Sequence, residues 1–243
     1  MTGNQEFQFN PGQHALLFAW TASEVIERAG QERGQAAVRK AVRKYGEQRG
    51  SRMAMRAMKD GLALDMTAYM AYGEWQAQAG AFESSMDTPD GMPRSLIFRC
   101  PWHEAWVANG INEAGRLYCL EIDPALARGF NPQVHLEVTG TRSNGAAACE
   151  FIYHQADLEA LHDIQVDKTQ TVMGWAYHIG HLYKTMREVL ILELGEIGAA
   201  SSKAGLQKFS EKFGRQAAEE IERYLEVDFD RLPIIENGGD SDE

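Results

Sequence analysis

The chain has 243 residues, of which 44% are hydrophobic and 24% are charged, a composition typical of a soluble globular protein. No stretch approaches the run of about eighteen apolar residues that a membrane span requires, and the first residues lack the basic and apolar regions of a signal peptide. The three cysteines, an odd number, do not suggest a disulfide framework. We therefore expect a cytoplasmic protein with reduced thiols and no membrane partner.

The net charge of −11 is unevenly distributed along the chain. Residues 219–243 hold ten acidic and two basic side chains, so we expect a disordered acidic tail over 235–243. Residues 28–59 are basic instead, and Arg39 and Arg43 lie four apart on one expected helix face. Such a face can bind nucleic acid, but no nucleic-acid motif accompanies it. We interpret it as solvated helix surface and expect no nucleic-acid partner.

Helical periodicity dominates the first third of the chain. Apolar residues recur at helical spacing, but Gly46 and Gly50 interrupt the pattern and predict a junction between two helices. A stretch with two prolines and several Gly, Ser and Asp residues, at 80–94, predicts a loop or lid. The helices expected before this loop span residues 13–30, 33–45, 49–61 and 66–75.

The middle of the chain predicts a small antiparallel sheet. Residues 95–99 have the composition of a strand, and two further strands at 134–141 and 147–153 flank the turn Asn144-Gly145, which is the strongest short-range signal for a hairpin. A helix expected over 113–126 would place Cys119 and Asp123 one turn apart on the same face. Amphipathic helices over 171–194 and 204–224 complete the pattern.

Together these elements predict an α+β fold, mostly helical, with a small antiparallel β-sheet formed by residues around 95–155. We expect residues 1–243 to form a single domain. Its parts are a helical N-terminal part at 10–80, an α/β core at 95–155, C-terminal helices at 167–225 and the acidic tail at 235–243.

All three cysteines fall within about fifty residues of one another. Cys100 precedes Pro101 at a strand-to-helix turn, which would bring its sulfur near a helix N-terminus with His103 close in space. Cys119 has Asp123 as an acidic neighbour instead, which would raise the pKa of the thiol. The alternative interpretation is that each cysteine is a small buried hydrophobic residue.

The clustering of the cysteines also allows a shared pocket or a soft-metal site. Cys100, Cys119 and Cys149 are the candidate ligands, with Glu137 as a further one. No Cys-x-x-Cys motif is present, so a structural zinc site is only weakly indicated. The sequence therefore leaves the cofactor open.

Two other groups of residues have suitable spacing for binding. His178 and His181 lie three apart and could share a ligand, but two histidines on a helix surface are the more common outcome. Arg49 and Arg52 bracket a Gly-Ser dipeptide, and their guanidinium groups could bind a carboxylate through paired hydrogen bonds. Ordinary helix-surface charge explains the arginine spacing equally well. Glu74, in the segment YGEW, could supply a carboxylate.

Several segments, taken together and in this order, resemble the L-2-amino-thiazoline-4-carboxylic acid hydrolase family over roughly residues 10–200. They are RGSRMAMRAMKDG at 49–61, YGEW at 72–75, CPWHEAW at 100–106, YCLEIDPAL at 118–126, GFNP at 129–132 and CEF at 149–151. Residues 129–151 also resemble the hairpin of the vinyl-4-reductase-type small-molecule-binding domain. Where that domain commonly has another cysteine, this chain has Thr139-Gly140-Thr141.

The first resemblance implies a hydrolase that opens a small cyclic amidine, thioimidate or amide ring with water, giving an N-carbamoyl amino acid. Such chemistry requires a nucleophile, a group that takes and returns a proton, and a cation for the substrate carboxylate. We expect Asp123 to act as the general base and His103 as the acid that protonates the leaving sulfur. Cys100 or Cys119 would attack covalently or line the pocket. Arg52 would bind the carboxylate, and Trp102 and Asn131 would shape the pocket.

The expected partner is a carboxylate-bearing small molecule. The sequence leaves open whether the chain forms a homo-oligomer. The second resemblance supports an alternative function, a non-catalytic small-molecule or metal-sensing domain. A sensor is normally joined to an output domain, and no DNA-binding motif is recognisable in this sequence. This comparison favours the enzyme.

Overall fold

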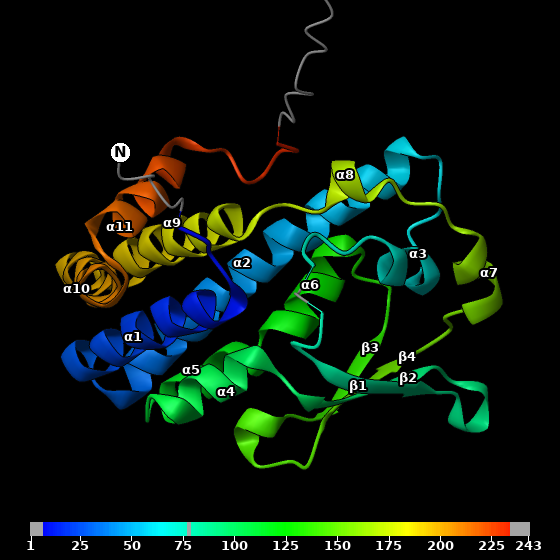
Figure 1. The fold of residues 1–243 in the computed structure, drawn as a ribbon, viewed down its shortest axis with the longest axis horizontal. Helices are drawn as coiled ribbons and strands as arrows, with labels where there is room; N and C mark the ends of the chain where they lie inside the picture. Colours follow the sequence, from blue (N-terminus) through cyan, green and yellow to red (C-terminus); the bar gives the residue numbers. More distant parts are fainter. Residues whose placement is uncertain (1–6, 77–78, 234–243) are drawn as a thin grey trace, which may run out of the picture.

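A computed structural model describes residues 7–76 and 79–233, and its architecture is α+β and mostly helical, which confirms the predicted fold class (Figure 1). The α-helices are α1 (Pro11–Ala29), α2 (Gln31–Lys59), α3 (Met66–Ala71), α4 (Pro101–Ala108), α5 (Asn112–Cys119), α6 (Ile122–Phe130), α7 (Leu158–Asp163), α8 (Lys168–Thr171), α9 (Trp175–Leu194), α10 (Glu196–Phe213) and α11 (Arg215–Glu222). The strands are β1 (Glu83–Asp87), β2 (Arg94–Arg99), β3 (Leu136–Gly140) and β4 (Cys149–Tyr153). Within this described part, no helix combines the length and hydropathy needed to cross a membrane.

A capping box formed by Asn10 and Gln13 starts helix α1. The Asn10 side chain accepts a hydrogen bond from the backbone N–H of Gln13, and the Gln13 side chain accepts one from the backbone N–H of Asn10. This reciprocal capping box satisfies two donors that the first turn would otherwise leave unpaired. Pro11 at the first helical position needs no N–H partner and fixes the entry of the chain.

Helix α2 runs without a break through both Gly46 and Gly50, so the predicted junction between two helices is wrong. The glycines serve a tertiary contact instead. A Cβ atom on Gly50 would lie 2.0 Å from the carbonyl oxygen of Leu126 in α6, and one on Gly129 would lie 2.3 Å from the carbonyl oxygen of Glu47. Helices α2 and α6 therefore cross with their backbones in contact, which only glycine permits.

The prediction of one helix over 113–126 is also wrong, because this segment forms two helices, α5 and α6. Pro124 explains the break. It lacks the N–H that a continuous helix would need at this position, but it is tolerated in the first turn of a new helix. Cys119 ends α5, whereas Asp123 lies in the first turn of α6, so the two residues do not share a helix face as expected.

The sheet has the strand order β1-β2-β4-β3, and every neighbouring pair is antiparallel. The predicted hairpin is confirmed as β3 and β4, with Gly145 in the left-handed conformation at φ 92°. Strand β1 lies inside the segment 80–94 that was predicted to be a loop or lid, so that prediction is wrong for Glu83–Asp87. All five residues of β1 are exposed, so no alternation of polar and apolar residues marks the strand in the sequence.

The C-terminal helices differ from prediction at their boundaries. Helix α9 begins at Trp175, four residues later than expected, after the short helix α8. The helix expected over 204–224 is two helices, α10 and α11, joined by Gly214 at φ 96°. The predicted acidic tail, 235–243, lies outside the described residues.

The helices form a layer above one side of the sheet in Figure 1, where α1 packs against α2, α9 and α10, and α2 packs against both α9 and α6. Helix α6 continues the layer toward the sheet and contacts β3. The residues between helices and sheet are apolar for the most part. The candidate functional site lies in this region.

Candidate functional site

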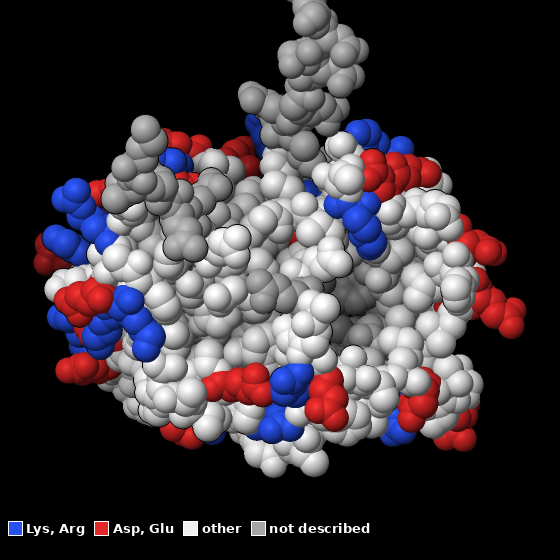
Figure 2. Space-filling view, in the orientation of Figure 1, with Lys and Arg blue, Asp and Glu red and all other residues white. Residues whose placement is uncertain are grey.

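A cavity of about 410 Å³ lies between the helical layer and the sheet. Figure 2 shows a hollow on this face that is bordered mainly by uncharged residues. Helices α2, α3, α4, α5 and α6 and strands β1, β2 and β4 contribute to its walls, together with residues 73–75 and Phe82 from between α3 and β1. The residues lining it are Arg49, Met53, Tyr69, Met70, Gly73, Glu74, Trp75, Phe82, Met86, Ile97, Cys100, Trp102, Tyr118, Cys119, Ile122, Asp123, Leu126, Thr141, Cys149, Phe151 and Tyr153.

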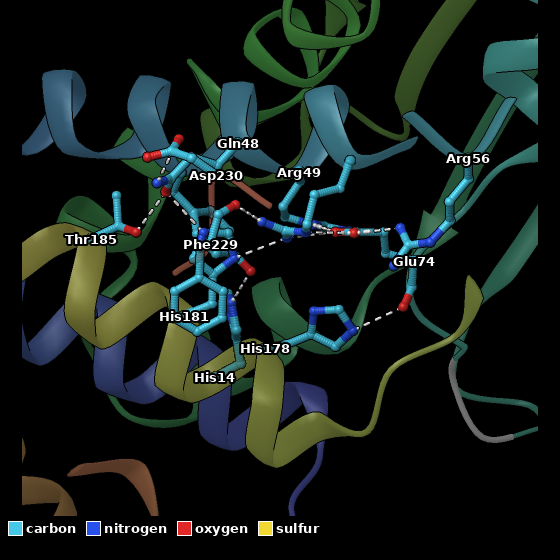
Figure 3. A network of polar contacts seen from close by, with 12 residues as sticks. His14, Gln48, Arg49, Arg56, Glu74, His178, His181, Thr185, Phe229 and Asp230 are labelled. Carbon is cyan, nitrogen blue, oxygen red and sulfur yellow. Dashed lines mark hydrogen bonds and ion pairs between the residues drawn. The ribbon is translucent and has the colours of Figure 1, made fainter. Parts of the chain in front are cut away.

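Beside this cavity, one carboxylate is surrounded by three arginines from α2 (Figure 3). Arg52 donates to Glu74 from Nε and from Nη2, at 2.8 Å in each case, and Arg56 donates from Nη1 at 2.7 Å. The Nε atom of Arg49 lies 3.5 Å from Glu74 Oε2, within ion-pair distance but without a hydrogen bond. The side chains of all four residues are at most 7% exposed.

The arginines keep Glu74 ionised. Burial alone would raise its pKa, but the opposing influence of the three guanidinium groups lowers the pKa to about 2. Three cations therefore surround one anion in the protein interior. Two positive charges remain uncompensated within the group, and a buried net charge is costly unless an anion pairs with it.

Three histidines beside the arginines add no charge at neutral pH. Burial is the main cause, and it lowers the pKa of His178 to about 3 and those of His14 and His181 well below the ordinary value. Their hydrogen bonds are those of neutral rings: His181 accepts from Arg52 at Nδ1 and donates to Gln48 from Nε2. The interpretation of His178 and His181 as helix-surface residues is wrong, since both are at most 1% exposed.

Arg49 is the arginine of this group that reaches the cavity. Its guanidinium lies over the Tyr45 ring, 5.6 Å from the ring centroid, and is only 4% exposed as a residue. Among the described residues, its Nε atom has no hydrogen-bond partner. That atom faces Glu74, but the residue also lines the cavity, and a buried guanidinium at a cavity wall is suited to bind an anionic ligand.

Asp123 enters the same cavity from the first turn of α6. The residue is partly buried, and it borders the cavity. Burial raises its pKa to about 6, against the lowering influence of the Arg49 charge. A carboxyl group with such a pKa can both accept and return a proton near neutral pH.

Cys100, Cys119 and Cys149 all line the cavity, which confirms that the cysteines share a pocket. Burial raises the pKa of Cys100 to about 11, although the backbone amides of His103 and Trp102 at the start of α4 act in the opposite direction. Burial likewise raises the pKa of Cys119 far above its ordinary value and raises that of Cys149. The thiols are therefore protonated at neutral pH. Within residues 7–76 and 79–233, no group of three or more His, Cys, Asp or Glu side chains is arranged to hold a metal ion.

Trp102, expected to shape the pocket, lines it and donates from Nε1 to His14 Nδ1 at 3.0 Å. Arg52, expected to bind the substrate carboxylate, does not reach the cavity. Its side chain is fully buried, and besides Glu74 it binds the carbonyl oxygen of Phe229 at 2.5 Å. The guanidinium is thus occupied by the protein itself.

Two further residues expected in the site lie outside the cavity lining. His103 is next to the pocket residue Trp102, but its Nδ1 atom lies 3.5 Å from Arg142 Nε. Asn131 donates to the carbonyl oxygen of Leu64 at 2.6 Å and so fixes the segment after α6. Sequence reasoning noted Arg49 and Arg52 as candidates for anion binding and Glu74 as a possible carboxylate, but spacing alone could not show which arginine opens into the cavity.

A partly open cavity with a few converging polar groups and an apolar wall, in an α+β fold, has the character of a small-molecule site. The chain belongs to the L-2-amino-thiazoline-4-carboxylic acid hydrolase family, whose model matches residues 12–153, more than half of the 243 residues. All the residues that line the cavity fall within this matched region. No curated protein and no solved structure matches the chain.

Proposed function

We propose that this protein is a hydrolase that opens a small, carboxylate-bearing ring of the cyclic amidine, thioimidate or amide class. The observation that carries this proposal is the presence of Arg49 and Asp123 in one cavity, the first as an anion-binding group and the second as a proton-transfer group. The family name supports the same reaction class. A 2-amino-thiazoline-4-carboxylate-like compound is the reference substrate.

Arg49 binds the substrate carboxylate. The cluster around Glu74 carries two uncompensated positive charges, and a substrate carboxylate at Arg49 would neutralise one of them in a site with little water. A guanidinium also fixes the orientation of a carboxylate, because two parallel hydrogen bonds can form between them. This assigns to Arg49 the role that the sequence suggested for Arg52.

Asp123 transfers the proton. Its ionised carboxylate takes a proton from water as the water oxygen attacks the ring carbon between nitrogen and sulfur. Asp123 passes that proton to the ring nitrogen, which has gained the electron pair of the C=N bond. When the carbon–sulfur bond breaks, Asp123 moves the proton of the new hydroxyl group to the departing sulfur, so that an N-carbamoyl amino acid with a free thiol results. One residue performs all of these transfers, because His103 lies outside the cavity.

In this proposal water, and not a cysteine thiol, attacks the ring carbon. A thiol attacks as its thiolate, and burial raises the pKa of Cys100 to about 11 and that of Cys119 well above its ordinary value. Neither thiol has a base with which it forms a hydrogen bond among the described residues. The cysteines then serve as small, neutral walls of the cavity.

The test is turnover of 2-amino-thiazoline-4-carboxylate by purified variants. Asp123→Asn should lower kcat by roughly 10²- to 10⁴-fold, the usual contribution of a proton-transfer group. Cys100→Ser and Cys119→Ser should each keep most of the wild-type kcat. Asp163→Asn, at an exposed position on α7, is the control for replacing an aspartate.

Three outcomes would each contradict part or all of the proposal. A near-normal rate for Asp123→Asn would exclude Asp123 as the proton-transfer group, and loss of turnover in either cysteine variant would favour covalent attack. Tight binding of cyclic carboxylates without turnover of any of them would support the non-catalytic binding module instead.

A further inference from the structure

The cavity has two ends that differ in burial and in chemistry. Its inner end holds buried polar groups: Arg49, assigned to carboxylate binding, is 4% exposed, and its ion-pair partner Glu74 is fully buried. Tyr118, which is 5% exposed, adds a further polar group there. The carboxylate of a substrate therefore belongs at this inner end.

The outer end of the cavity is apolar and accessible. Met86 of β1 lines it while remaining 50% exposed, and Phe82 and Ile97 line it as partly buried residues. Phe82 stacks on Trp75, with ring centroids 5.7 Å apart and an angle of 25° between the ring planes. Trp75 in turn packs against Trp102, 5.4 Å between centroids, so an aromatic wall extends inward from the entrance.

The size of the cavity exceeds what a single small ring needs. A volume of about 410 Å³ equals the share of roughly 14 water molecules in the liquid, and it falls in the range of about 300–1,000 Å³ that drug-sized ligands occupy. The family's namesake is one five-membered ring with an amino and a carboxylate group. With its carboxylate at Arg49, such a ring would leave the outer apolar wall facing water.

We infer that the preferred substrate is larger than the namesake: a heterocyclic carboxylate with an aromatic or bulky aliphatic group on the side of the ring opposite the carboxylate. Phe82, Met86 and Ile97 determine this specificity by packing against the added group. The inference rests on the proposed ring-opening function, and it adds the substrate class. When such a substrate binds, it covers apolar surface at the entrance that is otherwise exposed to water, and this burial favours binding.

The test compares two substrates that differ only in this group. The first is 2-amino-thiazoline-4-carboxylate, and the second carries a phenyl group on the exocyclic nitrogen, the position far from the carboxylate. Burying an aromatic group of this size predicts that the wild-type kcat/KM is higher for the phenyl compound by roughly tenfold to a hundredfold.

Variants of the residues at the entrance then identify which side chains cause the difference in kcat/KM. Met86→Ala and Phe82→Ala should each reduce the ratio of the two kcat/KM values by roughly threefold or more, because they remove apolar surface from the wall. Met92→Ala is the matched control. Met92 is an exposed methionine, 39% accessible, that follows β1 and does not line the cavity, so its variant should keep the wild-type ratio.

The outcomes separate this inference from the proposed function. A wild-type ratio near one, unchanged in Met86→Ala, would overturn the inference while hydrolysis itself stood. If neither compound is hydrolysed, the proposed function fails, and calorimetric binding of the same two acids decides the inference. At least tenfold tighter binding of the phenyl acid, reduced by Met86→Ala, would support it. Equal binding of the two acids, or binding of neither, would overturn it.

Discussion

The guanidinium of Arg52 and the carboxylate of Glu74 face each other through two parallel hydrogen bonds, each 2.8 Å long, with both side chains fully buried. Lysine cannot reproduce this paired geometry, and it would also leave the carbonyl oxygen of Phe229 without its donor. Arg52→Lys should therefore lower the free energy of unfolding by about 1.5–3 kcal/mol, the contribution of a hydrogen bond to a charged group. Urea denaturation measures this change.

Arg94 provides the matched control for this prediction. It makes the same paired contact with Asp87, at 2.9 and 2.6 Å, but at the surface, where its side chain is 29% exposed. Arg94→Lys should leave the free energy of unfolding close to that of the wild type, because exposed ion pairs contribute little. Equal losses in the two variants would mean that burial does not determine the strength of the Arg52 contact.

Replacing Asp123 should stabilise the protein above neutral pH. Its pKa rises from the ordinary value of 3.8 to about 6 on folding, so folding favours the protonated form. The resulting contribution to stability is complete below about pH 4 and is lost as the pH rises through about 6. Asp123→Asn avoids the cost of a buried charge, and its free energy of unfolding should exceed that of wild type by about 1–3 kcal/mol at pH 8.

The same measurement at pH 4 provides the control, because the two proteins should then have similar stability. An Asn variant that is less stable than wild type at pH 8 would contradict the prediction. The wild-type hydrolysis rate should rise with pH through about 6, since only the ionised Asp123 accepts a proton from water.

Acid should destabilise the protein through its buried histidines. Burial lowers the pKa values of His14, His178 and His181, that of His178 to about 3. Their contribution to stability is present above the ordinary pKa of 6.5 and is lost as the pH falls toward the folded-state values, because the unfolded chain binds protons that the folded chain excludes. Asp123 opposes this trend between pH 6 and 4, but three histidines outweigh one carboxyl group.

Unfolding free energies measured from pH 7 to 4 test this expectation. His178→Asn should show a shallower decline than wild type, whereas His162→Asn, at an exposed position on α7, should decline as wild type does. Identical slopes in all three proteins would show that His178 takes up its proton in the folded state as readily as in the unfolded one.

Gly50→Ala should destabilise the protein and reduce turnover together. The added Cβ would lie 2.0 Å from the carbonyl oxygen of Leu126 and 2.6 Å from the amide nitrogen of Phe130, so α6 must move away from α2. We expect a loss of about 1–3 kcal/mol, as for overpacked cores, despite the gain of about 1 kcal/mol in helix propensity. Displacement of α6 also moves Asp123, and kcat should fall. Thermal unfolding and steady-state kinetics measure the two effects.

Gly174→Ala is the control for Gly50→Ala. A Cβ on Gly174 would have no atom within 4 Å, so its variant should lose little stability and keep its activity. A Gly50→Ala protein as stable as wild type would mean that the two helices can separate without cost.

Features encoded by neighbouring residues could be predicted from the sequence. Asn144-Gly145 marked the β3–β4 hairpin, and local pattern marked β2, since each signal lies within a few residues. Strand β1 was missed because its exposed side chains carry no alternation and its pairing with β2 supplies the structure. The break at Pro124 has a local cause that a proline rule could have found.

The site was predicted in part. Trp102, Asp123 and the cysteines line the cavity as expected, whereas Arg52 does not. Arg49 and Arg52 have the same side chain three residues apart on one helix, so their difference arises from what packs against each of them. Glu74, which occupies Arg52, comes from a different part of the chain. No spacing rule within α2 contains that information.

The glycine contacts between α2 and α6 have a consequence for how this protein can change its substrate. Gly50 adjoins Arg49, and α6 carries Asp123. The distance between Arg49 and Asp123 is therefore set by direct contact between the backbones of α2 and α6. Substituting other side chains leaves that spacing intact. The entrance is built differently, because β1 is an edge strand that, within the part of the chain that the structure describes, pairs with β2 alone. If the entrance selects the ring substituent as inferred above, mutations on β1 should change the accepted substituent while Arg49 and Asp123 keep their separation.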